Sequence, residues 1–192
     1  LMNEKNLFTS ESVSEGHPDK VCDQIADAIL DYCLSIDPNS RVACEVFVST
    51  NYVLIGGEIT TKAKPDYDAI ARRVIKDIGY DKHEYGFSYD NVVVDVKVKT
   101  QSPNIAQGVD IGGAGDQGIM FGYATNETKG YMPLAISIAH KLVRVASMLR
   151  KSGEFKHARP DMKSQVTIDY EDPKNPRVVT VLMSVQHDHD AN

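Results

Sequence analysis

A repeated order of segments is the strongest constraint on the fold of this 192-residue chain. The first hundred residues alternate strand-like and helix-like stretches as β-α-β-β-α-β, and the same order starts again after residue 117. Apolar residues at helical spacing predict helices over 18–35, 66–79 and 133–151. Runs rich in β-branched residues predict strands over 7–9, 41–49, 52–60, 91–100, 118–124, 165–170 and 177–185.

Repeated units of this kind predict an α+β fold, with mixed or antiparallel sheets and helices on one face. The second unit is truncated after β-α-β-β, which leaves apolar sheet surface uncovered. We therefore expect either a fragment of a longer protein or a partner that covers the gap. The expected divisions are a first domain over 1–100, a connecting segment with a glycine-rich loop over 101–117, and a partial second domain over 118–192.

The composition excludes several classes of protein. Hydrophobic residues make up 42% and charged residues 25%, as in folded domains. A net charge of −6 argues against a nucleic-acid binder, and no apolar run is long enough to cross a membrane. The three cysteines form no CxxC pair, which is typical of reduced thiols and indicates a cytoplasmic protein.

The charge is distributed unevenly along the chain. Residues 1–37 carry eight acidic against two basic side chains, whereas residues 129–163 carry eight basic against two acidic ones. Two solvated helix faces explain this pattern. An acidic cation-binding region facing a basic polyphosphate-binding region explains it equally well.

Four segments carry residues suited to chemistry. The segment 10–20 places His17, Asp19 and Lys20 at a helix start, where free N–H groups favour phosphate, although a capping role is the alternative. Gly56-Gly57-Glu58 suits either a substrate ammonium group or a β-bulge. The other two are 101–110, a lid or a plain connection, and 112–118, a glycine-rich loop without a Walker A or GxGxxG pattern.

Other polar residues are better explained without chemistry. Taken alone, Glu45 in the middle of a strand is expected to be solvated. A solvated helix face is likewise expected for the aspartates at 23, 27 and 31. His187 and His189 belong to a strand exit and tail rather than to a metal site.

Five motifs in order carry a family resemblance. They are FTSESVSEGHPDK at 8–20, GGEITT at 56–61, QSP at 101–103, GAGDQG with FGYA at 113–124, and RPDMKSQV at 159–166. Together they resemble the methionine adenosyltransferase (S-adenosylmethionine synthetase) family over essentially the whole chain.

The resemblance implies an ATP-dependent transferase. In this family the sulfur of L-methionine attacks C5′ of ATP, and the released triphosphate is hydrolysed to phosphate and diphosphate. Two Mg²⁺ ions and one K⁺ assist at each site. The sites form between subunits of a homodimer or homotetramer. Another ATP-dependent enzyme, or a non-catalytic subunit or binding module with the same fold, is the alternative.

The resemblance also implies roles for individual residues. Catalytic roles fall to His17, Lys20 and Lys163, with His17 near C5′ and both lysines near the phosphates. The remaining implied roles are ATP binding by Glu11, His17, Asp161, Met162 and Lys163, methionine binding by Glu58, Gln101 and Asp116, Mg²⁺ binding by Asp19, and K⁺ binding by Glu45.

Two departures from the family pattern stand out. Family members are about twice as long, and their last third supplies further triphosphate-binding residues and a second Mg²⁺-binding aspartate. We therefore expect this chain alone to be inactive. The stretch between Val109 and Gly113 is also shorter than the usual gating loop.

Overall fold

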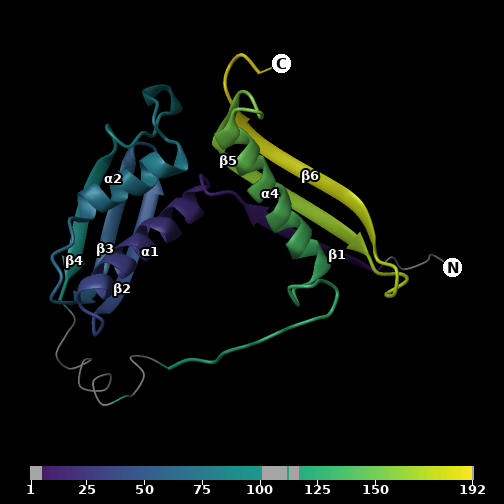
Figure 1. Cartoon of the computed structure of the whole chain (residues 1–192), viewed down its shortest axis with the longest axis horizontal. Helices are drawn as coiled ribbons and strands as arrows, with labels where there is room; N and C mark the ends of the chain where they lie inside the picture. The colour runs from purple at the N-terminus through teal and green to yellow at the C-terminus, as the bar shows by residue number, and fades with distance from the viewer. Residues whose placement is uncertain (1–5, 101–111, 113–116, 192) are drawn as a thin grey trace. The chain divides into compact units, whose positions relative to one another are not determined.

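The computed structural model describes residues 6–100, 112 and 117–191 (Figure 1). The chain forms two compact units, one of residues 1–20 with 122–192 and one of residues 21–121. Each unit contains a three-stranded sheet. Among the described helices, none has both the length and the hydropathy required to cross a membrane.

The sheet of the 21–121 unit is mixed. Strands β2 (Arg41–Ser49) and β3 (Tyr52–Thr60) form an antiparallel hairpin, and β4 (Val93–Lys99) pairs with β3 in parallel. A parallel neighbour needs a crossover connection, which α2 (Tyr67–Ile78) and the short 3-10 helix η1 (His83–Tyr85) provide. Helix α1 (Pro18–Ile36) lies with α2 over one face of this sheet (Figure 1).

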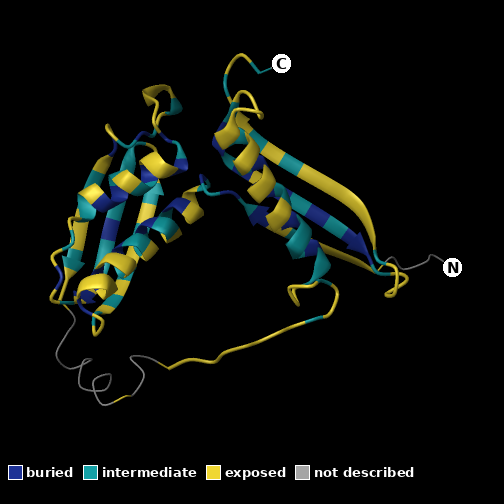
Figure 2. Cartoon of the chain, in the orientation of Figure 1, coloured by how far each residue is buried: buried dark blue, intermediate teal, exposed yellow. Residues whose placement is uncertain are grey.

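Helical spacing explains how α1 packs. Its buried residues Val21, Ile25, Ile29 and Cys33 recur every four positions and form one stripe. This stripe packs with buried residues of α2 and with the inner face of the strands in one apolar cluster. Figure 2 shows the alternation of buried and exposed positions along both helices. Each fully buried aliphatic side chain contributes about 1.5–3 kcal/mol to this core.

Polar contacts fix the ends of α2 and the connection after it. The Asp66 carboxylate accepts the Ala69 N–H at 3.0 Å, and Gly79 ends the helix in the left-handed conformation. The Arg72 guanidinium donates to the carbonyl oxygens of Tyr89 and Val92 at 2.8 and 2.9 Å. Arg72 therefore positions the segment that leads into β4.

The sheet of the other unit has the order β1-β5-β6, with β1 (Leu7–Val13), β5 (Ala158–Asp169) and β6 (Arg177–His187) antiparallel. Helix α4 (Leu134–Ser152) covers one face, where Ala135 and Ala139 pack against Val166 and Ile168. The expected α+β class, with mixed or antiparallel sheets and helices on one face, is confirmed.

Three expected strands differ in the structure. Strand β1 runs from Leu7 to Val13 instead of ending at residue 9, because its pairing with β5 continues through the polar residues from Ser10 onward. Residues 118–124 form no strand, because no described strand pairs with them, and Phe121 there is 90% exposed. Strand β5 begins at Ala158 rather than near residue 165, because β1 extends its pairing to Lys163 and β6 pairs with it from Ala158.

Strand β1 pairs with a strand from the far end of the chain. Its ladder runs from Leu7 opposite Asp169 to Val13 opposite Lys163. The first strand of the sequence therefore belongs to the sheet of the later segments. The expected domain boundaries at 100 and 118 stay a prediction, and the two compact units divide the chain at other points.

Apolar surface remains exposed on β6. Val178, Val179, Val181 and Leu182 are each about half exposed. An apolar groove of about 440 Å³ lies between α4 and β6, with Leu142 and Met183 among its lining residues. The described part of this unit therefore has uncovered apolar surface, as expected, although residues 118–124, the first strand of the expected β-α-β-β order, form no strand.

Contacts at the start of α4 make the stability of the fold depend on pH. Glu127 accepts hydrogen bonds from the Tyr170 hydroxyl at 2.6 Å and from the Leu134 N–H at 3.1 Å. These two bonds lower the pKa of Glu127, while burial and the Glu127 carboxylate raise the pKa of Tyr170 to about 12. Because the folded pKa of Glu127 lies below its unfolded value, its contribution is complete above the unfolded pKa and is lost as the pH falls through the folded pKa.

We expect Glu127→Gln to lower the free energy of unfolding by less than about 1 kcal/mol at pH 7, because the carboxylate is exposed. The difference from the unsubstituted chain should shrink as the pH falls below about 4. Urea unfolding across a pH range from about 3 to 7 measures it, with Glu84→Gln in η1 as the control. A difference that stays constant over the whole range would contradict this account.

Candidate active site

The loop between β1 and α1 is fixed to the start of β5. The buried Ser14 donates its N–H to the Met162 carbonyl oxygen at 2.9 Å. Its hydroxyl donates to the Pro160 carbonyl oxygen at 2.7 Å and accepts the Met162 N–H at 2.8 Å. These three bonds bring the motif at 8–20 against the motif at 159–166.

Gly16 makes the closest approach in this loop. A Cβ atom at this position would lie 2.3 Å from Pro160 Cβ and 2.4 Å from the Pro160 carbonyl carbon. Only a residue without a side chain fits here, so Gly16 allows the loop to lie directly on β5.

His17 has a defined tautomer in this loop. Its Nδ1 accepts the Asp19 backbone N–H at 3.2 Å, which leaves the proton of the neutral ring on Nε2. The Asp19 carboxylate lies farther from Nδ1, at 3.8 Å, so the backbone contact decides the tautomer. The His17 side chain is 15% exposed, and its Nε2–H can donate to an anion.

Glu15 holds the loop to α4. Its carboxylate bonds the Arg150 guanidinium at 2.9 Å and the Lys151 ammonium at 2.8 Å. The sequence pattern did not indicate Glu15, Ser14 or Arg150 as site residues. The opposite charges of residues 1–37 and 129–163 were the available signal, and this ion pair joins the two segments.

The face of the β1-β5-β6 sheet away from α4 carries the other expected ATP-site residues. Ser12 and Ser164 point toward α4, where they bond the His140 ring and the Ala139 carbonyl oxygen. Because side chains alternate along a strand, Glu11 and Lys163 lie on the opposite face. There Glu11 accepts a hydrogen bond from the Gln165 amide at 2.6 Å.

Asp161 and Met162 differ sharply in their surroundings. One carboxylate oxygen of Asp161, Oδ1, is buried and has no hydrogen-bond partner among the described residues. Met162 is fully buried, and Ser14 bonds both its N–H and its carbonyl oxygen. Met162 thus fixes its two neighbours, Asp161 and Lys163, on the open side of the strand.

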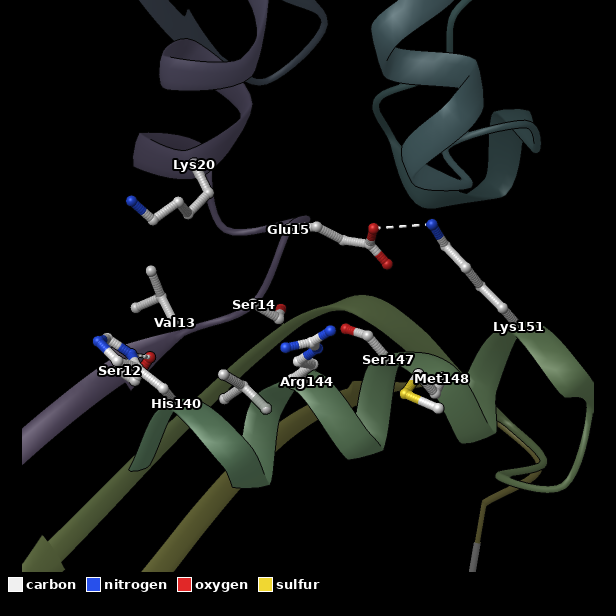
Figure 3. A pocket seen from close by; sticks show the side chains of 11 residues that line it. Ser12, Val13, Ser14, Glu15, Lys20, His140, Arg144, Ser147, Met148 and Lys151 are labelled. Carbon is white, nitrogen blue, oxygen red and sulfur yellow. Dashed lines mark hydrogen bonds and ion pairs between the residues drawn. The ribbon is translucent and has the colours of Figure 1, made fainter. Parts of the chain in front are cut away.

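Lys20 lies on the α4 side of the loop. It lines a pocket with residues of α4, among them Arg144 and Lys151 (Figure 3). Its expected place near the phosphates stays a prediction.

Glu45 and Glu58 lie in the other unit, on the sheet face away from its helices. Glu45 pairs with Gly56 and Glu58 pairs with Ala43, so the two exposed carboxylates are diagonal neighbours on adjacent strands. Two like charges so placed favour a bound cation. Burial, followed by the Glu45 charge, raises the pKa of the neighbouring Cys44 thiol to about 11. Gln101 and Asp116 lie outside the described residues.

The two glycines before Glu58 have different environments. Gly57 has φ +115°, and a Cβ there would lie 2.1 Å from the Ala43 carbonyl oxygen, whereas a Cβ at Gly56 meets nothing within 4 Å. The β2–β3 ladder runs through both positions without a register shift, which excludes the β-bulge alternative.

We therefore expect Gly57→Ala to lower the free energy of unfolding by about 2 kcal/mol, because a side chain at this φ is strained and meets the backbone of β2. Gly56→Ala is the matched control and should change it by less than about 0.5 kcal/mol. Urea unfolding of both variants measures the effect. Equal stabilities would contradict the assigned strain.

The carboxylates suit a magnesium ion that arrives with a phosphate ligand. No group of three or more His, Cys, Asp or Glu side chains gathers in the described part of the chain. Asp19 is 88% exposed, and Asp161 has a buried oxygen without a partner among the described residues. Mg²⁺ commonly takes one or two carboxylates, with waters and substrate phosphates as its other ligands.

Comparisons with known proteins cover both halves of the chain. Residues 5–103 match the profile of the S-adenosylmethionine synthetase N-terminal domain, and residues 111–192 match that of its central domain. S-adenosylmethionine synthases of Mesoplasma florum and Mycoplasma capricolum are 63% and 62% identical over 96% and 98% of this chain. The enzyme of Clostridium tetani is 53% identical over 95% of it. The chain spans about half, 50%, of each of these relatives.

Proposed function

Because the chain belongs to the S-adenosylmethionine synthetase family, we propose that the full-length protein makes S-adenosylmethionine from ATP and L-methionine. The observation that carries this proposal is the attachment of the His17 loop to β5 through Ser14. It joins the segment with the His17 N–H donor and the Asp19 carboxylate to the segment with Lys163. The donor and the lysine can bind a leaving polyphosphate directly, and the carboxylate can bind the Mg²⁺ that accompanies it.

In the proposed reaction, the methionine sulfur donates its lone pair to C5′ of ATP. The S–C5′ bond forms as the C5′–O5′ bond breaks, and that electron pair stays on the departing triphosphate. Water then cleaves the triphosphate to phosphate and diphosphate. His17 donates its Nε2 proton in a hydrogen bond to the leaving oxygen, and Lys163 neutralises phosphate charge.

The cations complete this proposal. Asp19 is the proposed Mg²⁺ ligand and Glu45 the proposed K⁺ ligand, with two Mg²⁺ and one K⁺ at each site. When bound, Mg²⁺ neutralises the triphosphate charge. Glu11, Asp161 and Met162 are the proposed nucleotide contacts, and Met162 also holds Asp161 and Lys163 in place. Lys20 lies toward the phosphates.

The remaining parts of the proposal concern substrate and assembly. Glu58, Gln101 and Asp116 bind the methionine amino-acid group, and sites form between subunits of a homodimer or homotetramer. The two profile matches, over 5–103 and 111–192, support a division of the chain soon after residue 100. The three free cysteines support a cytoplasmic location.

The test measures S-adenosylmethionine formation from methionine, Mg-ATP and K⁺. The chain is assayed beside a chimera in which the remaining half of the Mesoplasma florum relative follows it. We expect activity in the chimera only. Activity in neither, with a folded chimera, would favour a non-catalytic subunit, and activity in the chain alone would refute the need for the second half.

A further inference from the structure

The pocket that Lys20 lines lies on the α4 side of the β1-β5-β6 sheet. Its volume is about 400 Å³, within the range of small-molecule sites. The loop after β1 contributes Glu15, the first turn of α1 contributes Lys20, and α4 contributes Arg144 and Ser147 (Figure 3). Lys163 and Glu11 lie on the opposite face of the sheet, and Lys20 is the one residue of the proposed ATP site that lines this pocket.

Positive charge dominates the pocket. Three cationic side chains line it, Lys20, Arg144 and Lys151, against the single carboxylate of Glu15. That carboxylate already bonds both Lys151 and the adjacent Arg150. The negative charge in the lining is therefore compensated, and the pocket retains an excess of positive charge.

Arg144 provides the most specific feature. Its guanidinium makes no hydrogen bond or ion pair with any residue that the structure describes, and Figure 3 shows it beside Ser147 within the pocket. A guanidinium offers a planar set of donors that matches phosphate oxygens. The hydroxyl of Ser147 adds a neutral donor on the next turn of the helix.

The pocket also has an apolar part. Val143 and Met148 line it alongside the charged groups. The site can therefore accept either a free inorganic anion or an anion attached to a larger, partly apolar group.

We propose that this pocket binds a diphosphate group, free or carried by a nucleoside, separately from the proposed ATP and methionine site. Arg144 is the principal contact, and Lys151 adds charge. Lys20 is assigned to the triphosphate in the proposed function and is not required here. The inference does not depend on the proposed catalytic activity, because Arg144 and Ser147 have no role in the proposed reaction.

The experiment follows the Arg144 side-chain Nε–Hε signal by NMR while inorganic pyrophosphate or ADP is added to the chain. Saturable movement of this signal is expected with at least one of them. The affinity of Arg144→Gln, followed through the Ser147 backbone signal, should be about tenfold weaker or more, since a charged hydrogen-bond partner is removed. Ser147→Asp should also weaken the binding by repelling the anion.

Lys141→Gln is the matched control, because Lys141 lies on α4 but lines the apolar groove instead. It should leave affinity within about twofold. Tighter binding of ADP than of pyrophosphate would identify a nucleoside-linked diphosphate, and equal or weaker binding a free one. No saturable shift with either ligand, or equal losses in Arg144→Gln and Lys141→Gln, would overturn the proposal.

Discussion

Replacing Gly16 with alanine is expected to lower the free energy of unfolding by about 4 kcal/mol. The added Cβ would lie 2.3–2.5 Å from Cβ, C and O of Pro160, and two of these atoms are backbone. Overpacking costs about 1–3 kcal/mol, and separating the loop from β5 adds the loss of the buried Ser14 hydrogen bonds.

Urea unfolding of the chain measures this effect. Gly122→Ala is the control, because a Cβ at Gly122 meets nothing within 4 Å. It should change the unfolding free energy by less than about 0.5 kcal/mol. If Gly16→Ala were as stable as the control, the close packing of the loop on Pro160 would be wrong.

Elements specified by neighbouring residues were predictable from the sequence. Helix α1 begins at Pro18 as expected, and β2 and β3 have the expected bounds of 41–49 and 52–60. Asp66 and Gly79 mark the ends of α2 because each acts within one turn of the helix. Local spacing, caps and turns contain this information.

Pairing between segments that are distant in the sequence was harder to predict. The pattern near Leu7 predicts a strand but does not identify β5 as its partner. The apolar run at 118–124 resembles a strand locally, yet no described strand pairs with it. Strand formation depends on a neighbour, which a local pattern does not specify.

In the candidate site, too, local features were predictable from the sequence and contacts between distant segments were not. Motifs indicated His17 and Lys163, but the attachment of their segments depends on Ser14 and Gly16 contacting Pro160. The ion pair between Glu15 and Arg150 likewise joins distant segments. Residue type predicted the chemistry, whereas the fold determines which residues hold it in place.

Replacing Lys163 with methionine in the chimera is expected to lower kcat by about 100-fold or more. Lys163 is exposed on the open sheet face, where its charge can neutralise the departing triphosphate. Removing one preorganised charge from such a site typically costs this much. Because methionine binding is assigned to other residues, the KM for methionine should change little.

Steady-state kinetics and urea unfolding separate chemistry from folding. Stability of Lys163→Met should stay within about 0.5 kcal/mol, since an exposed side chain is replaced. Lys156→Met, at an exposed lysine before β5, is the matched control and should retain its kcat. A variant at Lys163 with unchanged kcat would remove this lysine from triphosphate stabilisation, because the loss of a charge that acts in the transition state must slow the reaction.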